Sequence, residues 1–367
     1  MDKKIFLFFL IPLGLITSCE ELMNEPEDSS NALLFQTEEA IENSLDKSYE
    51  NFKTCVEFFY VFDAVFTNQI EVPNEEWTPV YEREIGPDNR LNHTLWNQTY
   101  DLIYQLNKII KSADQFDRKV IIAQAKTMRA YLFHNLSNWY GAIPLDEEIQ
   151  NSEKYPAPEE EVIYYIQKEL KEAAELLPVN WSKKNYFTKD LAHALLVRLN
   201  TSDFLWDTSA VAYTKKILNT GFYSLADTNE SFTAHHPEII WGFEKRANTV
   251  FADYFNAGDY IPLIRLTECY LAMARNYYEN GYEEEALKYL NILRKRRNQP
   301  LLSSLNEELI IEQWSLEIII HEGMYFYTLK SFRVFQDNLN VVDYLEYIPI
   351  PNSALVNNPN LYQNSAY

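Results

Sequence analysis

Residue types that carry chemistry are spread along the chain without forming a catalytic motif. His321 is followed by Glu322, but the second histidine of a zinc-protease motif is missing. His235 and His236 have no matching carboxylate pattern for a metal site. The sequence contains no glycine-rich phosphate loop and no Gly-x-Ser-x-Gly turn. Acidic pairs are so frequent that none marks a glycosidase dyad. We therefore predict no enzyme activity, no metal and no cofactor.

One irregular stretch, residues 68–92, has the side chains that a carbohydrate site needs. Its prolines and glycine, with no steady hydrophobic period, predict a long loop. Aromatic rings stack on the C–H faces of sugars, and amide, carboxylate and guanidinium groups bond their hydroxyls. We predict ligand contacts from the polar and aromatic residues of this loop, which are Asn74, Glu75, Trp77, Tyr81, Arg83, Arg90 and Asn92. The alternative is that Trp77 and Tyr81 only fix the loop to the core.

The N-terminus has the features of an export signal. Lys3 and Lys4 precede an apolar run over residues 5–16, which is too short to span a bilayer. This predicts a signal peptide at residues 1–18. The order Ile-Thr-Ser-Cys at residues 16–19 resembles a bacterial lipobox, in which the cysteine is acylated and the chain is cut before it. We expect Cys19 to carry a lipid anchor and residues 19–36 to form a tether. A soluble secreted protein with an incidental Cys19 is the alternative.

Composition excludes two classes of protein. The chain has 32 Lys and Arg against 54 Asp and Glu, a formal net charge of −22. Such a surface lacks the clustered cations that grip a phosphate backbone, so nucleic acid is not an expected partner. An aromatic content of 15% argues against disorder. Cys55 and Cys269 could oxidise outside the cytoplasm, but both lie in apolar, helix-like stretches where buried free thiols are commoner.

Apolar residues recur at helical spacing along most of the chain. They predict helices at residues 37–52, 55–66, 93–113, 120–140, 158–177, 189–199, 210–219, 263–280, 283–297 and 307–335. A brief strand is predicted at 239–243, and residues 343–367 are expected to be loop or extended chain. Ala274, Tyr277, Ala286 and Leu290 fit a tetratricopeptide repeat with Gly281 at its turn. The predicted fold is an all-α scaffold of tetratricopeptide-like helix pairs with long loops.

The C-terminal third carries the most specific resemblance. Residues 264–272 read IRLTECYLA and residues 289–296 read YLNILRKR. Glu317 and residues 321–323 (HEG) follow, and the chain ends with IPIP at 348–351, NPNL at 358–361 and QNSAY at 363–367. In this order these stretches resemble the SusD/RagB family of outer-membrane lipoproteins. Looser similarities at residues 95–107, 128–145, 219–225 and 238–240 extend the resemblance over nearly the whole chain.

The resemblance implies a SusD-like domain over residues 19–367, with N-terminal helices and loops at 37–240 and C-terminal helices and tail at 261–367. It implies a lipid-anchored protein that faces the cell exterior from the outer membrane. Members of the family lie as a lid on a TonB-dependent transporter of the SusC/RagA type. They capture an oligosaccharide or, in some cases, a peptide, and do no chemistry on it.

One departure from the family is large. Only residues 241–263 stand where the family carries a long, ligand-facing segment. The ligand site is therefore expected in the N-terminal loops, or else the chain is a helical scaffold that stabilises a transporter without binding a ligand.

Other conspicuous side chains have structural interpretations. Trp96, Tyr100, Trp139 and Tyr140 lie at helical spacing and are expected in the core. We expect Arg265 and Glu268 to form ion pairs within or between helices. The basic run at residues 294–297 is interpreted as cations placed at the negative end of a helix.

Overall fold

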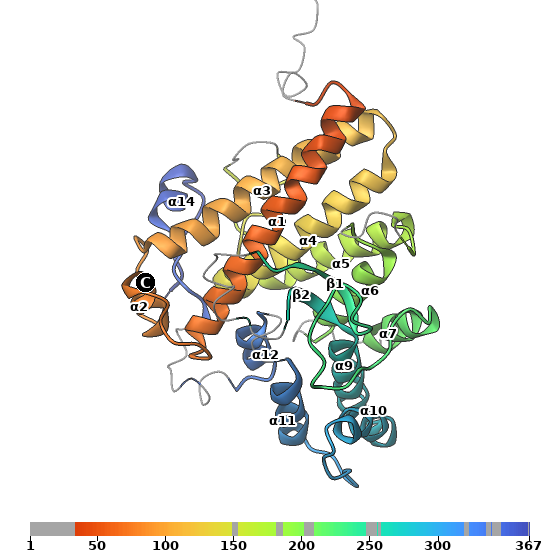
Figure 1. Cartoon of the computed structure of the whole chain (residues 1–367). Helices are drawn as coiled ribbons and strands as arrows, with labels where there is room; N and C mark the ends of the chain where they lie inside the picture. The colour runs from red at the N-terminus through yellow and green to blue at the C-terminus, as the bar shows by residue number, and fades with distance from the viewer. Residues whose placement is uncertain are drawn as a thin grey trace, which may run out of the picture. The chain divides into compact units, whose positions relative to one another are not determined.

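The structure is a computed structural model that describes residues 34–148, 153–180, 186–201, 209–246, 255, 258–318, 323–334, 339, 346–365 and 367. The chain separates into residues 1–33 and a compact unit from Leu34 to Tyr367, and everything below concerns the second. The predicted signal peptide, Cys19 and most of the predicted tether lie outside the described residues. Within the described part, regular structure is helical apart from one pair of strands (Figure 1). The all-α prediction is confirmed.

The first helix, α1, spans Glu38–Phe66 without a break. Thr37 caps it by accepting a hydrogen bond from the Ala40 amide at 3.1 Å, and Glu38 and Glu39 lie favourably in the first turn. The two separate helices predicted at 37–52 and 55–66 are one, because no glycine or proline interrupts the chain between them. Its second half is buried on nearly all sides, which hides the periodicity on which the prediction relied.

Five further long helices follow, and each packs against the next one in sequence. They are α3 (Arg90–Gln115), α4 (Lys119–Tyr140), α5 (Glu159–Leu176), α6 (Lys189–Leu199) and α7 (Ser209–Asn219). Contacts between consecutive helices run from α3 to α7, and α1 lies against α3 and α4 (Figure 1). The short turn at residues 116–118 leaves α4 beside α3, whereas longer connections lead to α5 and α6.

Two antiparallel strands form the only sheet among the described residues. β1 (Ile239–Glu244) confirms the predicted strand, and it pairs with β2 (Tyr260–Arg265). The helix predicted from residue 263 begins later, at α9 (Leu266–Glu279). Residues 263–265 belong to β2 because the ladder with β1 satisfies their backbone groups, which a sequence pattern alone does not reveal.

Helices α9 and α10 (Glu283–Arg296) form the predicted tetratricopeptide-like pair. Ala274 and Ala286 are fully buried where the helices meet, and small side chains there allow close packing. Gly281 takes a φ of +80° in the turn, a conformation that glycine adopts without strain.

The remaining helices are α11 (Glu307–Ile318), α12 (Tyr325–Ser331) and α14 (Asn352–Asn357). The prediction of one helix over 307–335 was wrong, because Gly323 separates α11 from α12 with a φ of +57°. The tail also contains more order than expected, since α14 starts directly after Pro351, which suits a helix entrance. Two short helical segments lie in the loop between α1 and α3. They are η2 (Glu75–Trp77) and α2 (Thr78–Tyr81).

The tail returns to the beginning of the fold. The Ile348 amide donates to the Trp139 carbonyl at 2.9 Å, and the Asn92 side chain donates to the Pro349 carbonyl at 2.8 Å. Figure 1 shows α14 beside α3. Cys55 and Cys269 are buried free thiols, as the sequence favoured. Among the described helices, none is both long enough and apolar enough to cross a membrane.

Candidate functional site

The loop predicted to bind a ligand is largely folded onto the protein. Asn74 caps η2 by accepting from the Glu76 amide at 3.0 Å, and Glu75 beside it is exposed. Trp77 is only 5% exposed, and its ring lies 5.7 Å from that of Phe58. The ring of Trp77 therefore contacts core aromatics more than solvent.

The following residues of the loop are also tied to the fold. Tyr81 packs partly buried against the core, and its carbonyl accepts from the Asn68 side chain at 3.3 Å. Arg83 has a φ of +62°, and its guanidinium bonds Asn68 and lies 5.7 Å from the centre of the Phe66 ring. These contacts hold the loop against the end of α1.

Arg90 and Asn92 differ sharply in exposure. The Arg90 side chain is 80% exposed and bonds both carboxylate oxygens of Glu76, which lowers the pKa of that carboxyl. Asn92 is fully buried, and its amide oxygen accepts from the Tyr140 hydroxyl at 2.7 Å. Of the seven predicted residues, Asn74, Glu75 and Arg90 face solvent, whereas Trp77 and Asn92 do not. A ligand role for the set remains a prediction.

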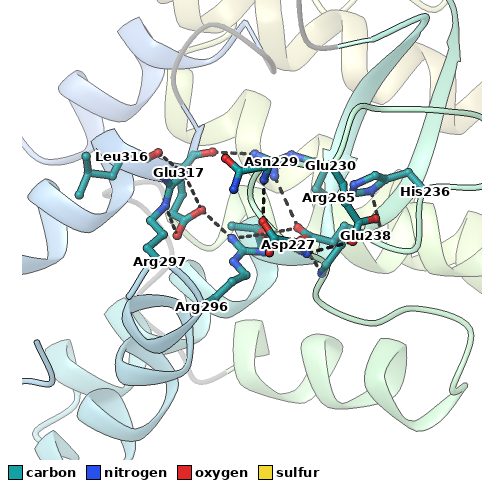
Figure 2. Close-up of polar contacts among 12 residues, drawn as sticks. Asp227, Asn229, Glu230, His236, Glu238, Arg265, Arg296, Arg297, Leu316 and Glu317 are labelled. Atoms are coloured by element: carbon teal, nitrogen blue, oxygen red, sulfur yellow. Dashed lines mark hydrogen bonds and ion pairs between the residues drawn. The ribbon is translucent and has the colours of Figure 1, made fainter. Parts of the chain in front are cut away.

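The charged residues of the C-terminal motifs meet in one buried network (Figure 2). Glu317 receives hydrogen bonds from Arg296 at 2.6 Å and from Arg297 at 2.8 Å, and its carbonyl accepts from Arg265 at 2.6 Å. Glu238 bonds Arg296 and lies 3.5 Å from Arg265. Both carboxylates are almost completely buried, so they depend on these partners for their charge.

The network is a brace between elements. It joins the start of β1 and the end of β2 to α10 and α11. Glu268 of α9 pairs with Arg198 of α6 through two hydrogen bonds of 2.6 Å, which confirms the ion pair expected between helices. Arg265 also forms an ion pair, but it ends strand β2 and its partner Glu238 precedes β1, so this pair is not between helices. The basic run at residues 294–297 does end a helix, but two of its arginines bond these carboxylates instead of only facing the helix end.

The aromatic residues expected in the core are there, and two of them have a second role. Trp96, Tyr100, Trp139 and Tyr140 are each 5% exposed or less. Trp96 and Tyr100 also form, with Tyr104, a row of rings one turn apart on α3, with ring centres 4.8 and 6.0 Å apart. These three residues line a cleft that the sequence interpretation missed, and of the three rings only that of Tyr104 is half-buried.

The cleft has a volume of about 140 Å³ and lies between α3 and the C-terminal segment. We call it the aromatic cleft; its walls are Trp96, Asn97, Tyr100, Asp101, Tyr104, Pro144, Ala354, Asn357, Asn358 and Leu361. Asn97 and Asp101 are exposed at its rim, and partial burial raises the pKa of Asp101. Asn358 is held by bonding the Lys154 carbonyl at 2.8 Å, so the wall from the tail is fixed in place.

A larger and more polar groove of about 410 Å³ lies on the other side of α3. We call it the polar groove; it runs between α1 and α3 and is lined by Ser44, Lys47, Ser48, Asn51, Thr54, Cys55, Gln98, Asp101, Leu102 and Gln105. Hydroxyl and amide side chains dominate it, and it has no aromatic ring. Its volume falls in the range of small-molecule sites.

The lining of the two cavities is suited to binding. In the aromatic cleft, the half-buried Tyr104 ring beside the Asn97 amide and the Asp101 carboxylate suits a polyhydroxylated ligand. No group of three or more histidine, cysteine or acidic side chains able to hold a metal occurs among the described residues. The i, i+4, i+8 spacing of Trp96, Tyr100 and Tyr104 was a signal in the sequence for one side of the aromatic cleft. No sequence signal indicated that residues of the C-terminal tail form the other side.

Comparison with known proteins finds SusD-like relatives. Residues 22–200 match the model of a SusD-like family described as starch-binding and associating with the outer membrane. The chain is 32% identical over 121 residues to the starch-binding protein SusD of Bacteroides thetaiotaomicron and 24% identical over 190 residues to the SusD-like protein P38 of Formosa agariphila. These alignments take in 29% and 48% of this chain, but only 21% and 38% of the two relatives.

The fold has relatives over a greater length. The surface glycan-binding protein A of Bacteroides uniformis superposes with a TM-score of 0.74 over 90% of this chain and all of that structure, at 15% identity. The likeness shows a shared fold. The family match over residues 22–200, together with the two relatives, shows that this chain belongs to the SusD/RagB family.

Proposed function

We propose that this protein captures an oligosaccharide and releases it unchanged to a partner transporter. The observation that carries the proposal is the aromatic cleft, where the half-buried ring of Tyr104 lies beside exposed Asn97 and Asp101, and the buried rings of Trp96 and Tyr100 complete the lining. Rings give sugar its stacking surface, and the amide and carboxylate give its hydroxyls donors and acceptors. The starch-binding description of the family and the glycan-binding name of the structural relative support the same ligand class.

Around this site we propose the cellular setting that the family suggests. Cys19 carries the lipid anchor, the protein faces outward from the outer membrane, and the partner is a TonB-dependent transporter of the SusC/RagA type. The description of the family as associating with the outer membrane supports this setting. Asn74, Glu75 and Arg90 in the exposed part of the loop are proposed as additional ligand contacts.

A second function deserves a test because of the short segment between β1 and β2. Only residues 245–259 connect the two strands, where the resemblance leads us to expect a long ligand-facing segment. The alternative function is therefore a helical lid that stabilises the transporter without binding a ligand.

Calorimetric titration of the purified protein with neutral oligosaccharides and with peptides separates these functions. We expect heat of binding with an oligosaccharide and none with peptides. Asn97→Ala should weaken that binding about threefold to tenfold, because one net hydrogen bond is lost at an exposed position. Asn43→Ala, also an exposed asparagine on a helix, is the matched control and should leave affinity unchanged.

Three results would contradict the proposal. Silence across the whole sugar panel would favour the lid, binding of peptides alone would change the ligand class, and release of reducing sugar would identify an enzyme.

A further inference from the structure

The two cavities described above meet at one residue. Asp101 lines both the aromatic cleft and the polar groove, and the other lining residues of α3 divide between them. Asn97 belongs to the aromatic side and Gln98 to the polar side, as expected for neighbours that point about 100° apart around a helix. Asp101 therefore stands on a ridge with one cavity on each side.

The polar groove presents side chains whose hydrogen-bonding groups are uncommitted. Lys47 and Asn51 lie one turn apart on α1, and Gln98 and Asp101 lie one turn apart on α3. All four are exposed, and no hydrogen bond or ion pair joins their side chains to other described residues. By contrast, Ser44 in the same groove accepts from Gln105. The four free side chains include both donors and acceptors, with one positive and one negative charge.

This set of groups selects a class of ligand. A neutral chain of hydroxyls can both donate to Asp101 and accept from Lys47, and the amides at Asn51 and Gln98 can do either. A polyanionic glycan would face a protein of net charge −22, which repels it. An extended peptide is usually held by a strand edge or by pockets for its side chains, and here both walls are helices.

We propose that the polar groove continues the aromatic cleft across α3, so that one neutral oligosaccharide occupies both, with Asp101 contacting it at the crossing. This inference rests on the proposed function and extends it. The aromatic cleft holds the first unit against the half-buried ring of Tyr104, and the polar groove holds the following units by hydrogen bonds alone. The ligand is accordingly a chain of several sugar units, and length is part of what the protein recognises.

A length series measured by calorimetry tests the inference. The probes are maltose, maltotetraose and maltoheptaose, with the corresponding cello- and xylo-oligosaccharides in parallel. We expect affinity to rise at least tenfold between the shortest and the longest member of the series that binds. The double variant Asn51→Ala/Gln98→Ala should lose at least fivefold in affinity for the longest member and change little for the shortest.

Two further variants make the result specific. Asp101→Ala should weaken binding of both short and long members, because its carboxylate faces both cavities. Asn43→Ala lies on the same helix as Asn51 but outside the groove, and should match the unmodified protein. All these positions are exposed, so circular dichroism and melting temperature should remain unchanged for every variant.

The outcomes separate the two proposals. Binding that is independent of length, or a double variant that binds the longest sugar as well as the unmodified protein, overturns the continuous site and leaves glycan capture standing. A lack of binding to any sugar in all three series overturns both.

Discussion

Trp77 shows how burial decides the role of a single side chain. Its ring lies against Phe58 and Phe62 and is almost closed to solvent. Trp77→Ala should therefore destabilise the fold by roughly 3–5 kcal/mol, because it removes a large buried ring and leaves a cavity. Thermal unfolding followed by circular dichroism should show a melting temperature several degrees lower.

The exposed Arg90, on the same loop, provides the control. Arg90→Ala should change the melting temperature little, since its ion pair with Glu76 lies in solvent. An unchanged melting temperature for Trp77→Ala, together with weakened sugar binding, would instead identify Trp77 as the stacking platform that its sequence context predicted.

Between elements, the most informative contact is that of Asp63 with α12. This α1 carboxylate is 2% exposed and accepts hydrogen bonds of 3.0 Å from the Tyr325 and Phe326 amides at the start of α12. No cation among the described residues pairs with it. Burial outweighs the two amide donors and raises the pKa of Asp63 from 3.8 to about 7.

A dependence of stability on pH follows from that raised pKa. The folded state binds the Asp63 proton more tightly than the unfolded chain, so its contribution to stability is complete below the unfolded pKa. It is lost as the pH rises to about 7. Denaturant unfolding at intervals from pH 4 to pH 8 should show a smaller fall in stability across this window for Asp63→Asn than for the unmodified protein. Parallel curves would contradict the prediction.

The helices were predictable where each has its own stripe of apolar residues and a glycine or proline at one of its ends. Examples are α4, which ends at Gly141, and α5, which starts after Pro158. Residues 263–265 were misassigned because their conformation depends on pairing with β1, more than twenty residues earlier in the chain. The break between α11 and α12 at Gly323 was missed for a similar reason. A Cβ at this position would overlap the Tyr60 ring, and the local sequence does not show this contact with α1.

The candidate site was predictable only in part. The aromatic row of α3 is encoded in one helix, and the sequence correctly predicted Trp96 and Tyr100 in the core but gave no role to the half-buried Tyr104. The cleft beside this row depends on α14 and Leu361, which lie more than 240 residues further along the chain. Neighbouring residues cannot encode such a contact. The composition of residues 68–92 therefore predicted a ligand site in that loop instead of in the cleft.

At the scale of the whole molecule, the strongly acidic chain needs something other than charge to reach a membrane. Anionic lipids repel a protein of net charge −22, so we attribute attachment to acyl chains on Cys19. Cys19→Ala should move the protein from the membrane fraction to the soluble fraction of fractionated cells. Labelling with a fatty-acid analogue should disappear at the same time.

The same experiment can contradict lipid attachment at Cys19. Unchanged membrane association and undiminished labelling in the Cys19→Ala variant would exclude this cysteine as the attachment point. The binding site itself should be unaffected in either case, because Cys19 lies outside the unit that contains both cavities.

The return of the tail to α3 and α4 has a consequence for biogenesis. Asn92 bonds Pro349 across 257 positions, and the wall of the aromatic cleft is made by residues 354–361. A ribosome must therefore finish almost the entire polypeptide before the cleft can close, and contacts so distant in sequence form slowly. Prematurely terminated products lack this wall of the cleft, and a purification tag fused to the C-terminus would lie only a few residues beyond it.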